Sequence, residues 1–226
     1  MSVIVVLKVL LILVVTPYLA IQVRKPSRWV GLPFAWLMNL SHSRLTDWGL
    51  QHVQIGQDLT ILDVGCGGGR TLQKLAAIAI AGKVCGLDYA AGSVAASRVR
   101  NAASIRAGRV EIVRASVSQI PFPAGTFDLV TAVETQYYWP DLVNDLREIL
   151  RVLKPGGTLV IIAETFRSGK NNKFIGSFMK LLGSPNLGVE DQEKLFSDAG
   201  YIDIKVVVES PKGWICAMGS KGPTTS

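Results

Sequence analysis

The segment from Ile61 to Thr71 constrains this chain more than any other part of its sequence. It reads ILDVGCGGGRT, an apolar run that ends at an acid, followed by glycines at alternate positions and a helix-like stretch. An uninterrupted apolar run is typical of a strand buried in a parallel sheet. Glycines let the backbone turn tightly and approach a ligand closely, and the next helix points its N-terminal amides at that ligand. The sequence therefore predicts a nucleotide-type site at the carboxyl end of a first strand.

The spacing of these glycines argues against a dinucleotide site. The dinucleotide fingerprint is G-x-G-x-x-G or A, in which the last position is small so that helix and strand pack closely. Counted from Gly65 that position is Arg70, and counted from Gly67 it is Leu72. Because both side chains are bulky, a different nucleotide ligand is favoured.

Further apolar runs follow the glycine loop in a regular order. The first of them ends in Asp88, about twenty residues past the loop, where an acid commonly accepts hydrogen bonds from ribose hydroxyls. A helix at residues 193–201 with a stop at Gly200 precedes the last two runs. The predicted strands after the loop lie near residues 84–88, 110–113, 126–133, 158–161, 204–208 and 214–218.

Three local motifs accompany these strands. They are Ile-Pro-Phe-Pro at residues 120–123, Phe-Asp-Leu-Val at residues 127–130 and Arg-Val-Leu-Lys-Pro-Gly-Gly at residues 151–157. Together with the Asp-x-Gly-x-Gly-x-Gly loop, this series resembles the class I S-adenosylmethionine-dependent methyltransferases, in particular their small-molecule branch. The resemblance covers roughly residues 45–220. It implies an α/β fold with a Rossmann-like seven-stranded, mostly parallel sheet, helices on both faces and an antiparallel last strand.

The resemblance and the composition together divide the chain into four parts. Residues 1–28 form a membrane-anchor segment with one hydrophobic helix, and residues 29–58 a linker with cap helices. Residues 59–219 form the S-adenosylmethionine-dependent methyltransferase domain, and residues 220–226 a disordered polar tail.

The family pattern assigns the cosubstrate contacts by position. Asp88 should hold the ribose, with Tyr89 beside the adenine, although a helix N-cap is the alternative role for Asp88. Ser116 and Val117 stand where many relatives carry an acid that accepts from the adenine amino group, and a hydroxyl accepts more weakly than a carboxylate. The residues expected around the methionine end are Asp63, Gly65, Cys66, Gly67 and Gly69, with Glu134 beyond them.

The acceptor side is expected after the fourth strand, because ligands bind at the carboxyl ends of strands in open α/β sheets. Glu134 is a candidate base, a group that orients an amine, or a partner of backbone amides in the pocket wall. Tyr138 and its neighbours Tyr137 and Trp139 either line an apolar acceptor site or pack in the core. His42, with an unperturbed pKa of about 6.5, is a second candidate base or a structural polar contact. We therefore take Glu134, His42 and Tyr138 as the candidate catalytic residues.

The N-terminus is nearly all Val, Leu and Ile from residue 3 to residue 23. A helix of this length is roughly 30 Å long, which matches a bilayer core, and Lys8 near its end can snorkel. A signal peptide would need a basic start and a better cleavage site, and a buried soluble helix is the plain alternative. Arg24, Lys25 and Arg28 follow directly, so the positive-inside rule places the catalytic domain in the cytosol.

The formal net charge is +7, and five arginines cluster between residues 98 and 114. No basic stretch is interleaved with aromatic residues, so nucleic acid is not an expected partner. A solvated helix face explains the arginines, with help in membrane docking as the alternative. Three scattered cysteines and two histidines predict neither a disulfide framework nor a metal site.

These features predict transfer of the methyl group of S-adenosylmethionine to a small, lipophilic acceptor. In an in-line displacement the enzyme mainly aligns the reacting groups. A membrane-bound NAD(P)-dependent oxidoreductase is one alternative, and the glycine spacing speaks against it. A non-catalytic S-adenosylmethionine-binding scaffold is the other, and the presence of both Asp63 and Asp88 speaks against that.

Overall fold

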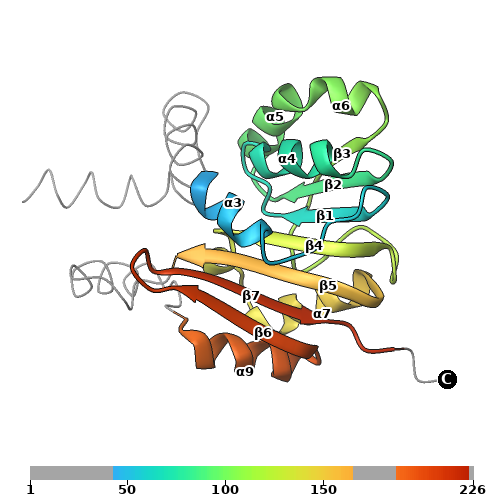
Figure 1. Ribbon diagram of the computed structural model, residues 1–226. Helices are drawn as coiled ribbons and strands as arrows, with labels where there is room; N and C mark the ends of the chain where they lie inside the picture. The colour runs from blue at the N-terminus through green and yellow to red at the C-terminus, as the bar shows by residue number, and fades with distance from the viewer. Residues whose placement is uncertain (1–42, 165–186, 224–226) are drawn as a thin grey trace, which may run out of the picture.

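A computed structural model of the chain describes residues 43–164 and 187–223. Its centre is a seven-stranded sheet with the strand order β3-β2-β1-β4-β5-β7-β6 (Figure 1). All neighbouring pairs from β3 to β5 are parallel, whereas β7 runs antiparallel to both β5 and β6. The strands are β1 (Thr60–Val64), β2 (Lys83–Asp88), β3 (Val110–Arg114), β4 (Phe127–Val133), β5 (Leu153–Glu164), β6 (Ile202–Glu209) and β7 (Trp214–Ser220). The predicted Rossmann-like sheet and its reversed last strand are confirmed.

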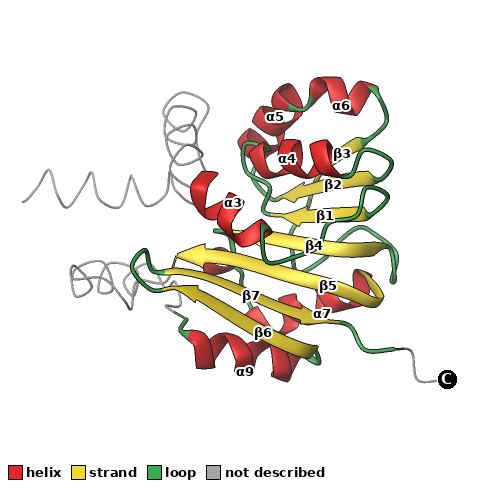
Figure 2. Cartoon of the chain, viewed as in Figure 1, coloured by secondary structure: helices red, strands yellow, loops and turns green. Residues whose placement is uncertain are grey.

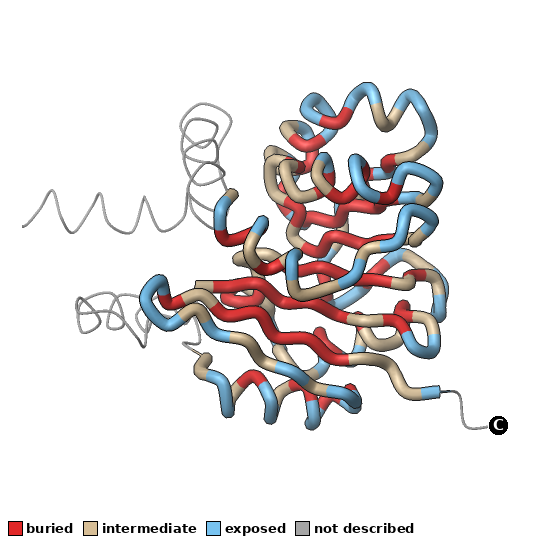
Figure 3. The backbone as a smooth tube through the Cα atoms, in the orientation of Figure 1, coloured by how far each residue is buried: buried red, intermediate tan, exposed pale blue. Residues whose placement is uncertain are grey.

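Helices cover both faces of this sheet (Figure 2). The described helices are α3 (Ser43–Leu50), α4 (Arg70–Ile78), α5 (Ala91–Arg100), α6 (Ala102–Arg106), α7 (Leu142–Val152) and α9 (Val189–Ala199), with a 3₁₀ turn η1 (Gln136–Tyr138). Alternate strand residues point to opposite layers. In β1, Ile61 belongs to the core layer that contains residues of α3 and α4, whereas Leu62 belongs to the layer that contains residues of α7 and α9. Because both layers need apolar side chains, the central strands are buried along most of their length (Figure 3).

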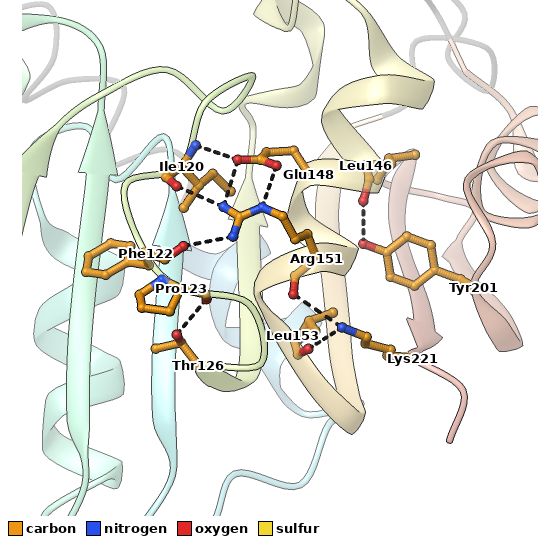
Figure 4. A network of polar contacts seen from close by, with 10 residues as sticks. All are labelled: Ile120, Phe122, Pro123, Thr126, Leu146, Glu148, Arg151, Leu153, Tyr201 and Lys221. Atoms are coloured by element: carbon orange, nitrogen blue, oxygen red, sulfur yellow. Dashed lines mark hydrogen bonds and ion pairs between the residues drawn. The ribbon is translucent and has the colours of Figure 1, made fainter. Parts of the chain in front are cut away.

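The motifs around residues 120 and 151 meet in one polar network (Figure 4). The Arg151 guanidinium donates to the carbonyls of Ile120 and Phe122 at 3.0 and 2.9 Å, and to both carboxylate oxygens of Glu148. Glu148 also accepts from the Ile120 amide at 2.9 Å. This pair fastens the loop before β4 to α7, and Glu148 has a lowered pKa because Arg151 favours its charged form. The Ile-Pro-Phe-Pro motif at residues 120–123 and the motif at residues 151–157 therefore contact each other through Arg151.

The C-terminal end departs from the expected disordered tail at residues 220–226. Ser220 is the last residue of β7, and the Lys221 backbone pairs with Gly156 and Gly157 at 2.9 Å. The Lys221 ammonium donates to the carbonyls of Arg151 and Leu153, where α7 ends. A cation at a helix C-terminus is stabilised by the unpaired carbonyls there. Order therefore extends past residue 220, and the predicted tail boundary is wrong by at least two residues.

The predicted membrane segment, the linker up to His42 and the residues between 165 and 186 lie outside the described residues. Within residues 43–164 and 187–223, no helix combines the length and apolar character that a bilayer span requires. The anchor at residues 3–23 therefore stays a prediction.

Candidate functional site

The glycine loop lies at the carboxyl end of β1, and hydrogen bonds tie it to the end of β2. The amides of Gly65 and Cys66 both donate to the Leu87 carbonyl, at 2.7 and 3.0 Å. The next amide, that of Gly67, does not bond the Leu87 carbonyl but donates to Oδ2 of the Asp88 carboxylate at 2.9 Å. The loop is therefore held against β2 as a rigid turn at the point where α4 begins.

The three alternating glycines are required for different reasons. All three have positive φ, at 70°, 50° and 77° for Gly65, Gly67 and Gly69. A Cβ on Gly65 would overlap the Thr135 side chain, and a Cβ on Gly69 would overlap side chains of α5. A Cβ on Gly67 would meet only the Gly65 carbonyl oxygen, at 4.0 Å. The first and last glycines are packed against protein, whereas the open side of Gly67 is where a ligand can lie on the backbone.

Helix α5 supports this loop from behind. The Asn101 side-chain amide donates to the Gly69 carbonyl at 3.0 Å and to the Ser97 carbonyl at 2.9 Å. Arg100 donates to the Gly68 carbonyl at 2.8 Å. Sequence reasoning missed these partners, because they lie about thirty residues from the loop and no local spacing connects the two. An Asn directly after the last turn of a helix was the only available signal.

Asp88 has two partners within the protein. Its two oxygens accept from the amides of Gly67 and of Ala90, which precedes α5, at 2.9 and 2.8 Å. Burial raises its pKa, and these two backbone bonds oppose the shift. A carboxylate has about four lone-pair sites, so two remain for the ribose hydroxyls. Asp88 is not the N-cap of α5, which is Ala90, and its remaining lone pairs leave it able to hold a ribose.

Asp63 and Cys66 are buried beneath the loop, with 2% and 6% of their surface exposed. The Thr131 hydroxyl on β4 donates to Asp63 at 2.7 Å, and burial raises the pKa of Asp63 to about 7 despite that bond. The Cys66 thiol lies 3.9 Å from the Ser97 hydroxyl, and burial raises its pKa, which keeps it neutral. Asp63 therefore lies in the sheet below the loop, and Cys66 is the buried residue of the loop itself; their direct contact with a cosubstrate stays a prediction.

The three predicted adenine contacts differ in how accessible they are to a ligand. Tyr89 is 39% exposed directly after Asp88, and its carbonyl accepts from Arg114 at 3.1 Å. Ser116 is exposed, and its hydroxyl accepts from the Ser118 amide at 3.2 Å. Val117 is buried in the core layer of α7 and α9. Tyr89 and Ser116 are therefore accessible to a ligand, whereas Val117 is mainly a core residue.

On the acceptor side, Glu134 ends the hydrogen-bond ladder between β4 and β5. Its amide donates to the Ile162 carbonyl at 2.9 Å, and the chain then leaves the strand because Glu134 has a φ of 55°. Its carboxyl group replaces the lost backbone acceptor and receives the Glu164 amide at 2.5 Å. The Tyr137 hydroxyl donates to the Glu164 carbonyl at 2.6 Å and lies 3.3 Å from the Glu134 carboxyl oxygen. Bonding to backbone amides, one of the three expected roles, is therefore present.

Burial raises the pKa of Glu134 to about 8, and the nearby Glu164 adds to the shift. Positive φ in a residue with a side chain is a strain that is concentrated at functional sites.

The other two candidate catalytic residues are placed differently. Tyr138 is half-buried with its ring edge-on to the ring of Tyr137, at 6.2 Å between the ring centroids. His42 lies outside the described residues. Among the described residues, no cluster of His, Cys, Asp and Glu could hold a metal ion.

Comparison with known proteins matches residues 62–161 to the family described as "Methyltransferase domain". The chain is 37% identical over 133 residues to the ubiquinone/menaquinone biosynthesis C-methyltransferase UbiE of Geobacter sulfurreducens, covering 57% of this chain and 50% of that protein. It is 37% identical over 98 residues to cycloartenol-C-24-methyltransferase 1 of Oryza sativa, covering 43% of this chain and 28% of that protein. The chain thus spans half or less of the length of these two relatives.

Solved structures share the fold at low sequence identity. A putative methyltransferase of Haloferax volcanii, in complex with the Trm112 methyltransferase activator, has a TM-score of 0.72 at 18% identity and covers 84% of this chain and 94% of that chain. Geranyl diphosphate C-methyltransferase of Streptomyces coelicolor has a TM-score of 0.68 at 17% identity, with 80% of each chain covered. Residues 62–161 thus match a methyltransferase domain, and the sheet with its reversed seventh strand has the fold of these solved methyltransferase structures.

Proposed function

We propose that this protein transfers the methyl group of S-adenosylmethionine to a small, lipophilic acceptor. The observation that carries this proposal is the open side of Gly67 next to Asp88, at the carboxyl ends of β1 and β2. A nucleoside cosubstrate fits there, because its ribose can bond the free lone pairs of Asp88 while its chain passes over Gly67. Bound in this place, S-adenosylmethionine supplies an electrophilic methyl group.

The residues after β4 fit the acceptor side of this reaction. Gly65 packs directly against Thr135, so the glycine loop and the segment from Glu134 to Trp139 adjoin each other. Tyr137 and Tyr138 present aromatic rings in that segment, and Trp139 packs on the core beside it. An apolar, aromatic wall suits a lipophilic acceptor. The relatives named above act, by their names, on cycloartenol and in ubiquinone and menaquinone biosynthesis, and this supports the same choice.

Glu134 is the candidate proton acceptor. Methylation of a carbon or of a hydroxyl oxygen leaves a proton that the acceptor must lose. A general base works best when its pKa lies near the operating pH, and the pKa of Glu134 is raised to about 8. We propose that Glu134 takes this proton once it has ionised, so the methylation rate rises with pH up to about 8.

We further propose that residues 3–23 anchor the protein in a membrane with the catalytic domain on the cytosolic side. The apolar length of this segment and the cations Arg24, Lys25 and Arg28 support this orientation. Full-length protein should remain in carbonate-washed membranes, and cytosolic protease should digest the domain in sealed vesicles. Protein that washes off, or a domain protected from protease, would overturn the anchor or the orientation respectively.

The activity is tested with S-adenosylmethionine labelled in its methyl group and a total lipid extract from the source cells. The purified protein should move label into the organic phase, and the variant Gly67→Val should not. Gly125→Val is the matched control, because Gly125 also has positive φ (64°) and nothing lies within 4 Å of the position that a Cβ would take there. It lies in the turn before β4, away from the glycine loop. Label that enters only water-soluble products would contradict a lipophilic acceptor.

An NAD(P)-dependent oxidoreductase remains the second candidate for a nucleotide site at this position. Nothing among the described residues favours it over methyl transfer, and the bulky Arg70 and Leu72 oppose it. Reduction of NAD by the same lipid extract, without any transfer of label, would decide for this alternative.

A further inference from the structure

The exposed surface of α5 and α6 has an unusual composition. It holds no carboxylate, no amide and no hydroxyl group among its exposed side chains. Val99, in the middle of this surface, is 80% exposed. Solvated helices normally mix charges of both signs. The exposed residues of α5 and α6, from here on the arginine–alanine face, are Ala91, Ala95, Arg98, Val99, Arg100, Ala102, Ala103 and Arg106.

Within the described part of the chain, the arginines of this face are not paired with carboxylates. Arg98 donates to the Ile112 carbonyl at 2.9 Å and Arg100 donates to the Gly68 carbonyl, and both acceptors are neutral. Of the ion pairs among the described residues, none includes an arginine of this face. The nearby Glu111 is paired with Lys83 at 2.7 Å. The positive potential of the face is therefore not cancelled by the protein itself.

Charge is also distributed unequally between the two ends of the sheet. Residues 65–114, at the β3 end, contain eight Lys and Arg but only two Asp and Glu. Residues 187–209, which form α9 and β6 at the other end, contain six Asp and Glu and two Lys. Figure 1 shows α5 and α6 at one end of the molecule and α9 at the opposite end. Such a dipolar molecule turns its basic end toward an anionic surface.

The chemistry of the face selects among anionic partners. Guanidinium groups bind phosphates in a bidentate way, and alanine and valine side chains between them can enter the boundary of a lipid layer. Recognition of a nucleic acid also uses aromatic rings that stack on bases or polar side chains that reach base edges. The arginine–alanine face has neither kind of group. A lipid surface therefore fits better than DNA or RNA.

We infer that the arginine–alanine face docks on an anionic lipid surface, with Arg98 and Arg106 on lipid phosphates and Val99 inserted between the headgroups. This contact is separate from the segment at residues 3–23 and does not depend on methyl transfer. It orients the folded domain, so that the β3 end of the sheet lies against the membrane and the α9 end lies away from it.

The test places a fluorophore that reports polarity on full-length protein carrying Val99→Cys. The three native cysteines are buried, so the new thiol reacts selectively. The matched control carries the label at Ser197→Cys, an exposed position on α9. With vesicles that contain phosphatidylglycerol, the emission of the Val99 label should shift to shorter wavelength, and the Ser197 label should not respond. Vesicles of pure phosphatidylcholine should leave both labels unchanged.

A further variant tests whether the response depends on charge. Arg98→Gln together with Arg106→Gln should abolish the shift of the Val99 label, and 0.5 M salt should weaken it, because exposed charges are screened over about 4 Å at this ionic strength. Equal shifts at both labels, no shift at Val99, or an equal shift with phosphatidylcholine would overturn the inference. A shift of the Val99 label with duplex DNA and not with phosphatidylglycerol would also overturn it, in favour of a nucleic-acid surface.

Discussion

Two carboxyl groups lie at the carboxyl ends of the strands on either side of β1, Asp88 as the last residue of β2 and Glu134 directly after β4, and they show how differently the two sides of the proposed site are built. Each is bound to backbone amides inside the protein. Asp88 joins the glycine loop to the start of α5, and its backbone has no positive φ. Glu134 has a φ of 55° and a pKa raised to about 8. The proposed cosubstrate side is therefore shaped by main-chain geometry, and the proposed acceptor side by side-chain bonds around a strained residue.

The largest expected effect comes from the variant Gly67→Val on the cosubstrate side. The valine side chain would fill the open space over the loop, and a β-branched residue is unfavourable at positive φ. We expect a folded protein whose affinity for S-adenosylmethionine falls at least about a thousandfold, which is about 4 kcal/mol. Calorimetric titration measures this. The variant Gly125→Val should bind normally, and normal binding by Gly67→Val would show that the ligand does not lie over Gly67.

The variant Gly65→Ala separates packing from binding in the same loop. The new methyl group would overlap Thr135, so one side of the contact must move. Overpacking together with an unfavourable φ should lower the free energy of unfolding by roughly 2–4 kcal/mol. Denaturant titration of this variant and of Gly67→Ala measures the difference, because the alanine at residue 67 would meet only the Gly65 carbonyl oxygen, at 4.0 Å. Equal losses of stability in the two variants would remove the distinction between packed and open glycines.

Asp88→Ala should weaken S-adenosylmethionine binding by roughly 1.5–3 kcal/mol, the range for hydrogen bonds to a charged group. It also removes the acceptor for the amides of Gly67 and Ala90, so some stability is lost as well. Titration with adenosine and with methionine separately would locate the loss on the nucleoside half. If adenosine binds the variant as tightly as the native protein, Asp88 serves only the loop.

On the Glu134 side, a pH dependence of stability is expected. Its folded-state pKa of about 8 lies above the unfolded value of 4.5, so the unfolded chain loses this proton first as the pH rises. The native protein should therefore lose stability between pH 4.5 and 8 relative to Glu134→Gln, and a shift of this size corresponds to about 5 kcal/mol. The glutamine can still accept the Glu164 amide. Parallel unfolding curves of the two proteins at every pH would show that the carboxyl group does not titrate in this window.

The regular part of the fold was predictable from the sequence because its information is local. Each central strand is an apolar run between turn residues, and all seven predicted strands are present in the predicted parallel and antiparallel pattern. The predicted glycine loop is also present after β1, with positive φ at all three alternate glycines. The strands and the loop depend on the order of residues within about ten positions, which a periodicity argument can read. The parallel and antiparallel pattern of the sheet was implied by the resemblance to the class I methyltransferases.

The partners of the loop were not predictable in this way. Asn101 and Thr135 contact the glycines from distant parts of the chain, and only the packing of α5 and of β4 brings them close. The polar roles of Glu134 and Tyr137 depend on where β5 ends, at Glu164. The order at Lys221 likewise depends on the end of α7. Each of these contacts is tertiary, so no local sequence pattern predicts it.

The most direct test of the proposed cosubstrate site is one calorimetric comparison of S-adenosylhomocysteine with NAD on the full-length protein. We expect S-adenosylhomocysteine to bind with one site per chain and NAD to give no heat of binding, because the loop has the open Gly67 and lacks the dinucleotide spacing. Binding of NAD together with no binding of S-adenosylhomocysteine would contradict the assignment of the glycine loop and the proposed methyl transfer with it.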